Sequence, residues 1–275
     1  MNLDKKIWLY WHQGFENSPE LVQKCTAKWK ELNPSWEVVL LTQKNLSEYL
    51  DALPIPSVIQ GKMLLAHKSD LIRTQLLVKY GGVWADPTTY PIQKIDDWLP
   101  AYMTSGLFMF QNPGRDRVIS NWFIAADKNN SLLAQLFTEL CAYWSENDFK
   151  NLGAHTRSTL IQNLEVIINR NTDWPLVWFS PLMTKVFRIA PYLVYHYKFY
   201  QLVKNNANLG RYFNEMTVFE SDIPHQLKRL GLLKPVTDEV KELVNDQQIP
   251  LFKLDWKIVP NAIPENSIID YLFHN

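Results

Sequence analysis

The chain has 275 residues, of which 47% are hydrophobic and 20% are charged, and its formal net charge is zero. This length is enough for one large domain or two small ones, with a sizeable core. Because Lys and Arg only balance Asp and Glu, no basic excess is available to neutralise phosphates, so the composition argues against nucleic acid as a partner.

In chain order, apolar runs bounded by turn residues alternate with segments of helical periodicity. Strands are predicted at 5–11, 36–42, 83–85, 106–112 and 121–127, with a late strand-like run at 249–256. Helices are predicted at 19–32, 45–53, 61–80, 131–144, 156–170 and 182–203. This alternation predicts an α/β fold with a mostly parallel sheet and helices on both faces.

Polar residues follow two of the predicted strands at the point where each strand ends. His12 and Gln13 follow the first strand, and Asp86 follows the strand 83–85. Ligands of such sheets bind beyond the carboxyl ends of the strands. We therefore expect a binding site at this edge.

The predicted helix 61–80 carries two charges on the face that should be covered. At 100° per residue Lys68 and Lys79 mark the solvent side, whereas Asp70 and Arg73 project roughly opposite, among apolar residues. Three residues apart, they can form a buried structural ion pair. Alternatively, they form the wall of a cleft, where arginine meets phosphate and aspartate meets a hydroxyl. The position of Asp86 at a nearby strand end favours the second interpretation, in which Asp70 and Arg73 line a cleft.

Four segments carry a family resemblance: "IWLYWHQG", "NPSWEV", "SDLIRTQLLVKYGGVWADPTTY" and "KLDWK". They resemble the capsular polysaccharide synthesis glycosyltransferases. That family is similar to the wider group of retaining, DXD-containing transferases with a GT-A fold, including yeast mannosyltransferases and clostridial glucosylating toxins. The resemblance implies a GT-A-like (Rossmann-like) nucleotide-sugar-binding sheet flanked by helices, with a helical C-terminal part.

The resemblance also implies one glycosyltransferase domain over residues 1–275. Within it we expect a donor-binding half at 1–128, an acceptor-binding helical part at 129–250 and a closing segment at 251–275.

Five residues of the first third of the chain take roles from the resemblance. Trp11 would stack on the nucleotide base, with His12 beside it, although a core tryptophan is the alternative for Trp11. Asp70 would contact the ribose or sugar of the donor, and Arg73 the sugar and diphosphate. Asp86 resembles the first acid of the DXD motif. Asp70, Arg73 and Asp86 are the predicted catalytic residues.

The chain departs from the DXD pattern at its second acid, where Thr88 stands. A threonine hydroxyl is a weak, neutral ligand for a hard divalent cation. Two alternatives remain. Either Asp86 and the diphosphate hold Mn²⁺ or Mg²⁺ with water, or cationic side chains replace the metal.

The segment "FKLDWK" near the end offers further donor-binding residues. In the wider group a C-terminal loop with a tryptophan closes over the diphosphate, which is the role expected for Trp256. Lys253 or Lys257 would neutralise charge on the leaving group, and Asp255 would complete a metal site with Asp86 and Thr88. An ordinary exposed strand end is the alternative.

Together these features predict a retaining transferase that moves a sugar from a nucleotide-sugar, a UDP-sugar by expectation, to a saccharide or lipid-linked saccharide of a growing capsular or surface polysaccharide. We find no signal peptide or spanning segment and expect a cytoplasmic location. The Tyr- and Lys-rich stretch 192–204 is either a packed helix or a contact with the membrane surface. In the second case we expect the protein at the inner face of the cell membrane. The rival is a non-catalytic nucleotide- or polysaccharide-binding protein with a degenerate DXD motif.

Overall fold

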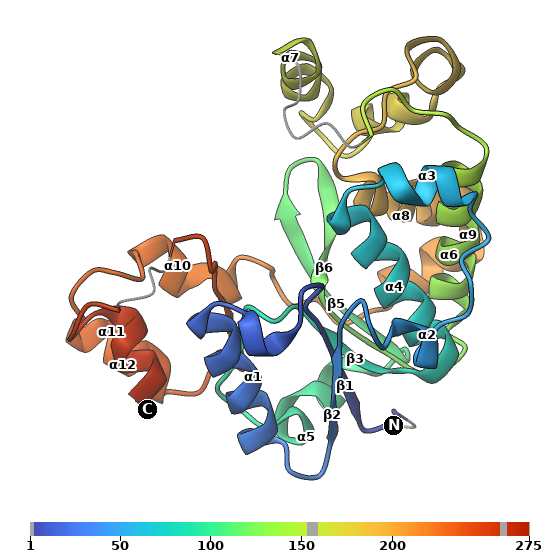
Figure 1. The fold of residues 1–275 in the computed structure, drawn as a ribbon. Coiled ribbons are helices and arrows are strands. Elements are labelled where there is room, and N and C mark those ends of the chain that lie inside the picture. Colours follow the sequence, from blue (N-terminus) through green and yellow to red (C-terminus); the bar gives the residue numbers. More distant parts are fainter. Residues whose placement is uncertain (1–2, 153–158, 259–262, 275) are drawn as a thin grey trace.

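The computed structural model describes residues 3–152, 159–258 and 263–274. Its centre is a five-stranded sheet with the order β2-β1-β3-β6-β5 (Figure 1). The strands are β1 (Lys6–Tyr10), β2 (Glu37–Leu41), β3 (Gly82–Ala85), β5 (Leu107–Gly114) and β6 (Arg117–Ala126). The expected α/β fold, a sheet flanked by helices, is confirmed.

The sheet is mixed, so the prediction of a mostly parallel sheet is wrong. Strand β1 pairs in parallel with β2 and β3, but β6 runs antiparallel to both β3 and β5. No helix separates β5 from β6, and a tight turn between Gly114 and Arg117 joins them. A short connection permits only an antiparallel pair, because a parallel pair needs a long crossover.

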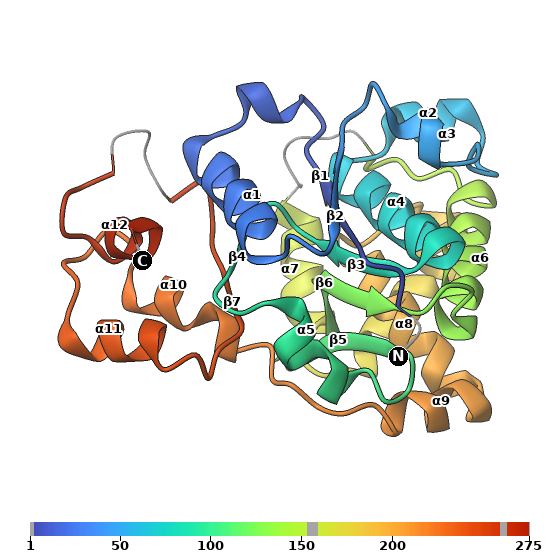
Figure 2. The same cartoon turned by 90° about the horizontal axis from the view of Figure 1, so that it is seen from below.

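Alternate strand residues enter two separate apolar layers, one on each face of the sheet. Trp8 and Trp84 face α4 (Leu65–Tyr80), α6 (Ser131–Ser145) and α8 (Val194–Asn205). Ile7 and Val83 face the other layer, which includes residues of α1 (Glu20–Leu32) and α5 (Ile95–Trp98). Figures 1 and 2 show these two groups of helices on opposite sides of the sheet.

The turn from α4 into β3 explains how the helix and the strand end of the candidate site are tied together. The Gly81 N–H caps α4 on the Leu77 carbonyl at 2.9 Å, and Gly81 and Gly82 have φ angles of 71° and 90°. A Cβ on Gly82 would lie 2.6 Å from the Lys6 carbonyl oxygen, so glycine is required where the chain passes β1. The predicted end of the helix at residue 80 is confirmed.

Two predicted helices are each divided in the structure. The segment 61–80 contains the end of α3 (Ser57–Lys62) and all of α4, because Met63 and Leu64 are extended between them. The segment 182–203 contains a π-helix (Leu182–Phe187) and most of α8, with Arg188 in the left-handed region at φ 57°. Pro191 lies between these two and cannot continue a helix from the preceding residues.

The remaining helices either shorten a prediction or were not predicted. Helix α2 (Leu46–Tyr49) lies within the predicted 45–53, and α7 (Thr159–Ile168) within 156–170, whose residues 156–158 lie outside the described ranges. The unpredicted ones, besides α3 and α5, are α9 (Ala207–Asn214), α10 (Gln226–Leu230), α11 (Asp238–Asn245) and α12 (Ile268–His274).

Helices α10, α11 and α12 form a C-terminal lobe, whose apolar cluster also includes Leu21 and Cys25 of α1. A second, two-stranded sheet connects this lobe to the rest of the chain, with β4 (Thr89–Pro91) antiparallel to β7 (Leu251–Lys253). The strand-like run predicted at 249–256 is therefore strand β7, and it pairs with β4 outside the central sheet. In Figure 2 the lobe lies beside α1.

Candidate active site

A cleft of about 680 Å³ lies where β1 and β3 end, between α4 and the segment after β7. The structure brings every residue that the sequence nominated into the lining of this one cleft: Trp11, His12, Asp70, Arg73, Asp86, Thr88, Lys253, Asp255, Trp256 and Lys257. Their placement agrees with the expected site at the carboxyl edge of the sheet, while their roles stay predictions.

Strand geometry fixes the two backbone positions at the base of the cleft. The Trp11 N–H donates to the Leu41 carbonyl at 2.9 Å, continuing the β1–β2 pairing, and the Asp86 N–H donates to the Trp122 carbonyl at 2.7 Å. Parallel β1 and β3 therefore end side by side, and residues 11 and 86 emerge at the same edge.

Arg73 is the most constrained side chain of the cleft. Its Nε donates to the Ser69 carbonyl at 3.1 Å and its Nη2 to Ser69 Oγ at 3.0 Å, while Nη1 donates to the Asn121 carbonyl. The guanidinium also lies over the Trp84 ring, 4.9 Å from the centroid. These contacts fix the planar fork in one orientation, which a flexible lysine would not achieve.

The guanidinium of Arg73 connects two carboxylates. Its Nη2 lies 3.5 Å from Asp70 Oδ1, and its Nη1 lies 3.6 Å from Asp86 Oδ1. The two alternatives for Asp70 and Arg73 are thus not exclusive, because they form a buried ion pair that also lines the cleft.

Asp70 is buried and accepts a hydrogen bond from Asn121 Nδ2 at 2.7 Å. Burial raises the pKa of Asp70 to about 7, with the Arg73 charge lowering it and the Asp86 charge raising it. The charge of this carboxyl therefore changes close to neutral pH.

Asp86 sits between two cations. Besides Arg73 on its Oδ1, Lys253 Nζ lies 3.7 Å from its Oδ2, and Trp84 Nε1 donates to Oδ1 at 3.1 Å. Its carboxylate is therefore held in place on both sides.

Lys253 reaches the cleft because β7 pairs with β4. Thr89 lies opposite Lys253 in that pairing, and the Leu254 N–H donates to the Thr88 carbonyl at 2.8 Å. Lys253 Nζ donates to Thr88 Oγ1. Burial lowers the pKa of Lys253, while the Asp86 charge acts to raise it.

Two indoles meet at the rim of the cleft. Trp11 and Trp256 have ring centroids 5.8 Å apart at 86°, an edge-to-face contact, and Trp256 is 39% exposed. Trp11 is only partly buried, so the alternative of a core tryptophan is wrong. His12 Nδ1 is 2.7 Å from the Tyr10 hydroxyl.

The predicted metal ligands do not form a cation site on their own. Asp86 and Thr88 both contact Lys253, and Asp255 pairs with Lys228 at 3.3 Å. Burial acts to raise the pKa of Asp255, but hydrogen bonds from the Lys257 backbone and from Lys228 lower it overall. Across the described ranges no group of three or more His, Cys, Asp or Glu residues could hold a metal ion, whereas Mg²⁺ and similar hard cations prefer several oxygen ligands.

A comparison with known families agrees with the sequence resemblance. The family model described as "Capsular polysaccharide synthesis protein" matches residues 1–151, more than half of the chain. The chain belongs to this family. The matched region contains every nominated residue up to Thr88, while Lys253, Asp255, Trp256 and Lys257 lie beyond it.

Curated relatives of this family member carry glycosyltransferase names. O-glycosyltransferase braB of Annulohypoxylon truncatum is 32% identical over 149 residues, which cover 47% of this chain and 35% of the relative. The initiation-specific alpha-1,6-mannosyltransferase of Saccharomyces cerevisiae is 27% identical over 104 residues, covering 35% and 22%. The chain thus matches well under two thirds of the length of these relatives.

Two solved structures show a distant likeness. The UDP-bound glycosyltransferase domain from the YGT toxin has a TM-score of 0.42 at 10% identity, with 99% of this chain and 94% of that chain covered. The PaToxG glycosyltransferase also has a TM-score of 0.42, at 14% identity, with 88% and 83% covered.

Several cleft residues were not found from the sequence. Asn121 is the polar residue directly before the apolar run 122–126 of the predicted strand, and this position was the available signal. Lys228 and His225 come from a segment whose helix was not predicted, so nothing local marked them. Burial, together with the charges of Lys253 and Lys228, lowers the pKa of His225 to about 4, which leaves its ring neutral.

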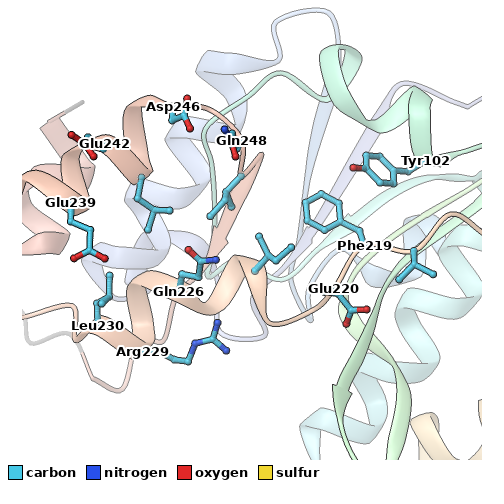
Figure 3. A pocket seen from close by; sticks show the side chains of 14 residues that line it. Tyr102, Phe219, Glu220, Gln226, Arg229, Leu230, Glu239, Glu242, Asp246 and Gln248 are labelled. Atoms are coloured by element: carbon cyan, nitrogen blue, oxygen red, sulfur yellow. The ribbon is translucent and has the colours of Figure 1, made fainter.

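A second hollow of about 800 Å³ lies between α10 and α11 of the C-terminal lobe and the residues Tyr102 and Phe219 (Figure 3). Its polar side chains include Arg229 on α10 and Glu239 and Glu242 on α11, with Tyr102 and Phe219 at the opposite end. It contains none of the nominated residues.

Proposed function

We propose that this family member is a retaining glycosyltransferase that moves a sugar from a nucleotide-sugar, a UDP-sugar by preference, to a saccharide acceptor. The observation that carries the proposal is the convergence of Asp70, Arg73 and Asp86, with Arg73 within 3.6 Å of both carboxylates in a cleft at the strand ends. Glycosyltransferase names among its relatives support the same activity.

We propose one orientation for the donor in the cleft. The base stacks on Trp11 at the rim, with His12 beside it, because an indole face suits a planar base. The hydroxyls of ribose and sugar meet the Asp70 and Asp86 carboxylates. The diphosphate then meets the cationic side chains, of which Arg73 is the most rigid.

In the reaction, the bond from the anomeric carbon to the phosphate oxygen breaks and its electron pair leaves on the nucleoside diphosphate. The acceptor oxygen bonds to the same face of that carbon, and the acceptor proton passes to the departing phosphate. No strong general base is needed, so Asp70 and Asp86 orient the sugar. Fixed cations stabilise the charge that develops on the leaving group, and removing one such stabiliser costs ~10²–10³ in rate.

Closure of the segment after β7 would exclude water from the donor. Trp256 and Lys257 lie at the rim and line the cleft, which supports that role for the segment 251–275. We assign donor binding to 1–128 and acceptor binding to the helical part 129–250, which contributes Tyr192 and His196 to the cleft.

We further propose a lipid-linked acceptor, met at a membrane surface. Eight of the fifteen exposed large hydrophobic side chains in the described ranges lie within residues 166–192, and Tyr192 among them lines the cleft. By contrast α8 is mostly buried, so the stretch 192–204 is chiefly a packed helix and the candidate contact lies at 166–192. Within the described ranges, no helix combines the length and apolar content needed to cross a bilayer.

The test is release of UDP from a panel of UDP-sugars, with and without Mn²⁺ and with saccharide acceptors. We expect release with one donor, lost in Arg73→Ala and Asp86→Ala. Arg229→Ala is the matched control, since this arginine lines the second hollow. Tight donor binding without turnover on any acceptor would instead favour the non-catalytic binding protein.

A further inference from the structure

The cleft contains a cation at the place where a DXD motif would use a metal. Lys253 Nζ lies 3.7 Å from Asp86 Oδ2 and donates to Thr88 Oγ1. It therefore contacts the first acid of the motif and the residue standing at the second acid. A divalent cation bound to both positions would have to displace this ammonium.

The residue types at positions 88 and 253 complement each other. A neutral hydroxyl at 88 accepts one hydrogen bond and leaves the ammonium its charge, whereas a carboxylate there would neutralise it. An ammonium has three donors. Thr88 Oγ1 takes one of them, and Asp86 Oδ2 at 3.7 Å is an ion-pair contact beyond hydrogen-bond distance, so donors remain for a phosphate oxygen in the cleft.

The backbone prevents Lys253 from being a loosely attached surface lysine. The pairing of Thr89 with Lys253 and the hydrogen bond from the Leu254 N–H to the Thr88 carbonyl lock β7 onto the motif itself. The Lys253 side chain is only 15% exposed. Its charge is thus preorganised, which is the condition for strong stabilisation of a leaving group.

The overall charge of the cleft also favours binding of an anion without a metal. Four cationic side chains line it, namely Arg73, Lys228, Lys253 and Lys257, against three carboxyl groups, Asp70, Asp86 and Asp255. Asp86 contacts two of the cations and Asp255 a third. Such a lining suits the anionic diphosphate directly, whereas a site built to concentrate divalent cations is rich in unpaired carboxylates.

We propose that Lys253, together with Arg73, takes the place of the divalent cation, so that this protein binds a nucleoside diphosphate and stabilises its departure without metal. The inference rests on the proposed function for its catalytic part, but its binding part stands on the cleft alone.

The first experiment measures UDP binding by isothermal titration calorimetry on the unmodified protein, once in EDTA and once in Mn²⁺. We expect dissociation constants that agree within about twofold. Lys253→Met, which keeps the length of the side chain, should weaken binding roughly 10- to 100-fold, as expected for loss of a charge-assisted hydrogen bond. Lys241→Met is the control, because Lys241 is a surface residue paired with Asp238.

The second experiment tries to restore a metal site. In the double variant Thr88→Asp/Lys253→Met the second acid is present and the ammonium is gone. We expect this variant to bind Mn²⁺, detected by electron paramagnetic resonance, and to bind UDP only when Mn²⁺ is added. The unmodified protein should show no bound Mn²⁺ under the same conditions.

The outcomes separate the inference from the proposed function. UDP binding or turnover that is lost in EDTA and regained with Mn²⁺ overturns the inference and leaves the transferase intact. UDP binding that persists in EDTA without turnover of any donor supports the binding part of the inference, and it overturns the proposed function together with the catalytic part. Absence of UDP binding under both conditions overturns the inference on the unmodified protein, whether or not the variants fold.

Discussion

The cleft at the strand ends and the hollow of Figure 3 differ in the origin of their charges. The cleft at the strand ends draws its ionic groups from α4, the end of β3, β7 and α10, which lie far apart in the sequence. The hollow of Figure 3 has the larger volume, about 800 against 680 Å³, but most of its lining comes from residues 218–249. Carboxylates spaced along one helix are typical of a solvated face.

The charges are also arranged differently. In the cleft, Arg73 and Lys253 approach Asp86 from two sides, and the carboxylates of Asp70 and Asp86 face a common space. In the second hollow Arg229 is paired with Asp222, at 2.8 Å and largely exposed, a contact of little energetic weight. Convergence of constrained charges from distant segments, rather than volume, therefore marks the candidate active site.

The largest expected effect comes from removing the bridge between the two carboxylates. Arg73→Ala should reduce UDP release from the donor by at least ~10²–10³-fold, because the fixed cation facing the leaving group is lost. Single-turnover UDP release measures this. Arg229→Ala in the second hollow should stay within twofold, and comparable losses in both variants would erase the distinction between the hollows.

Asp86→Asn tests the charge at the end of β3. The amide keeps the shape but removes the charge that orients the sugar and faces Arg73 and Lys253, so we expect a loss of ~10²-fold in kcat/KM. Glu242→Gln is the counterpart in the second hollow and should leave kcat/KM unchanged. Full activity of the Asp86→Asn variant would show that the active site does not include Asp86.

Trp11→Leu tests the rim of the cleft. Stacking of a base on an aromatic ring is worth about 1–3 kcal/mol, so UDP binding should weaken roughly 5- to 150-fold, with a smaller effect on the rate of the bound complex. Titration calorimetry gives the affinity. Trp174→Leu, at an exposed tryptophan outside the cleft lining, serves as the control. Equal UDP affinities for Trp11→Leu and the unmodified protein would show that the base does not stack on Trp11.

The smallest effect concerns pH and the stability of the cleft. Because the pKa of Asp70 is about 7 in the folded protein and 3.8 as its ordinary value, the folded state holds a proton that the unfolded state has lost between these limits. This carboxyl therefore makes the free energy of unfolding fall as pH rises from about 4 through 7. Asp70→Asn should flatten that part of the profile in urea titrations, and an unchanged slope would contradict the assignment.

Local patterns in the chain were sufficient for much of this picture. Alternation of apolar runs and amphipathic segments gave β1, α1, β2, β3 and α6 within a few residues, and the glycine pair marked the end of α4. The charged face of α4 and the acid after β3 indicate a cleft from the sequence alone, since an unpaired charge on a covered face needs a partner or a ligand. The family resemblance supplied the roles.

Other features depend on which segments meet in space. Three contacts join residues up to 165 positions apart. They are the antiparallel pairing of β6 with β3, the pairing of β4 with β7, and the contact of Lys253 with Thr88. Lys228 enters the cleft in the same way, without a local signal. Helical and strand periodicity reports the neighbours of a residue along one element, but pairing between elements is settled by packing and backbone hydrogen bonding of the whole chain. That is why the acid of the motif could be recognised in advance, while the lysine beside it became visible only in the folded protein.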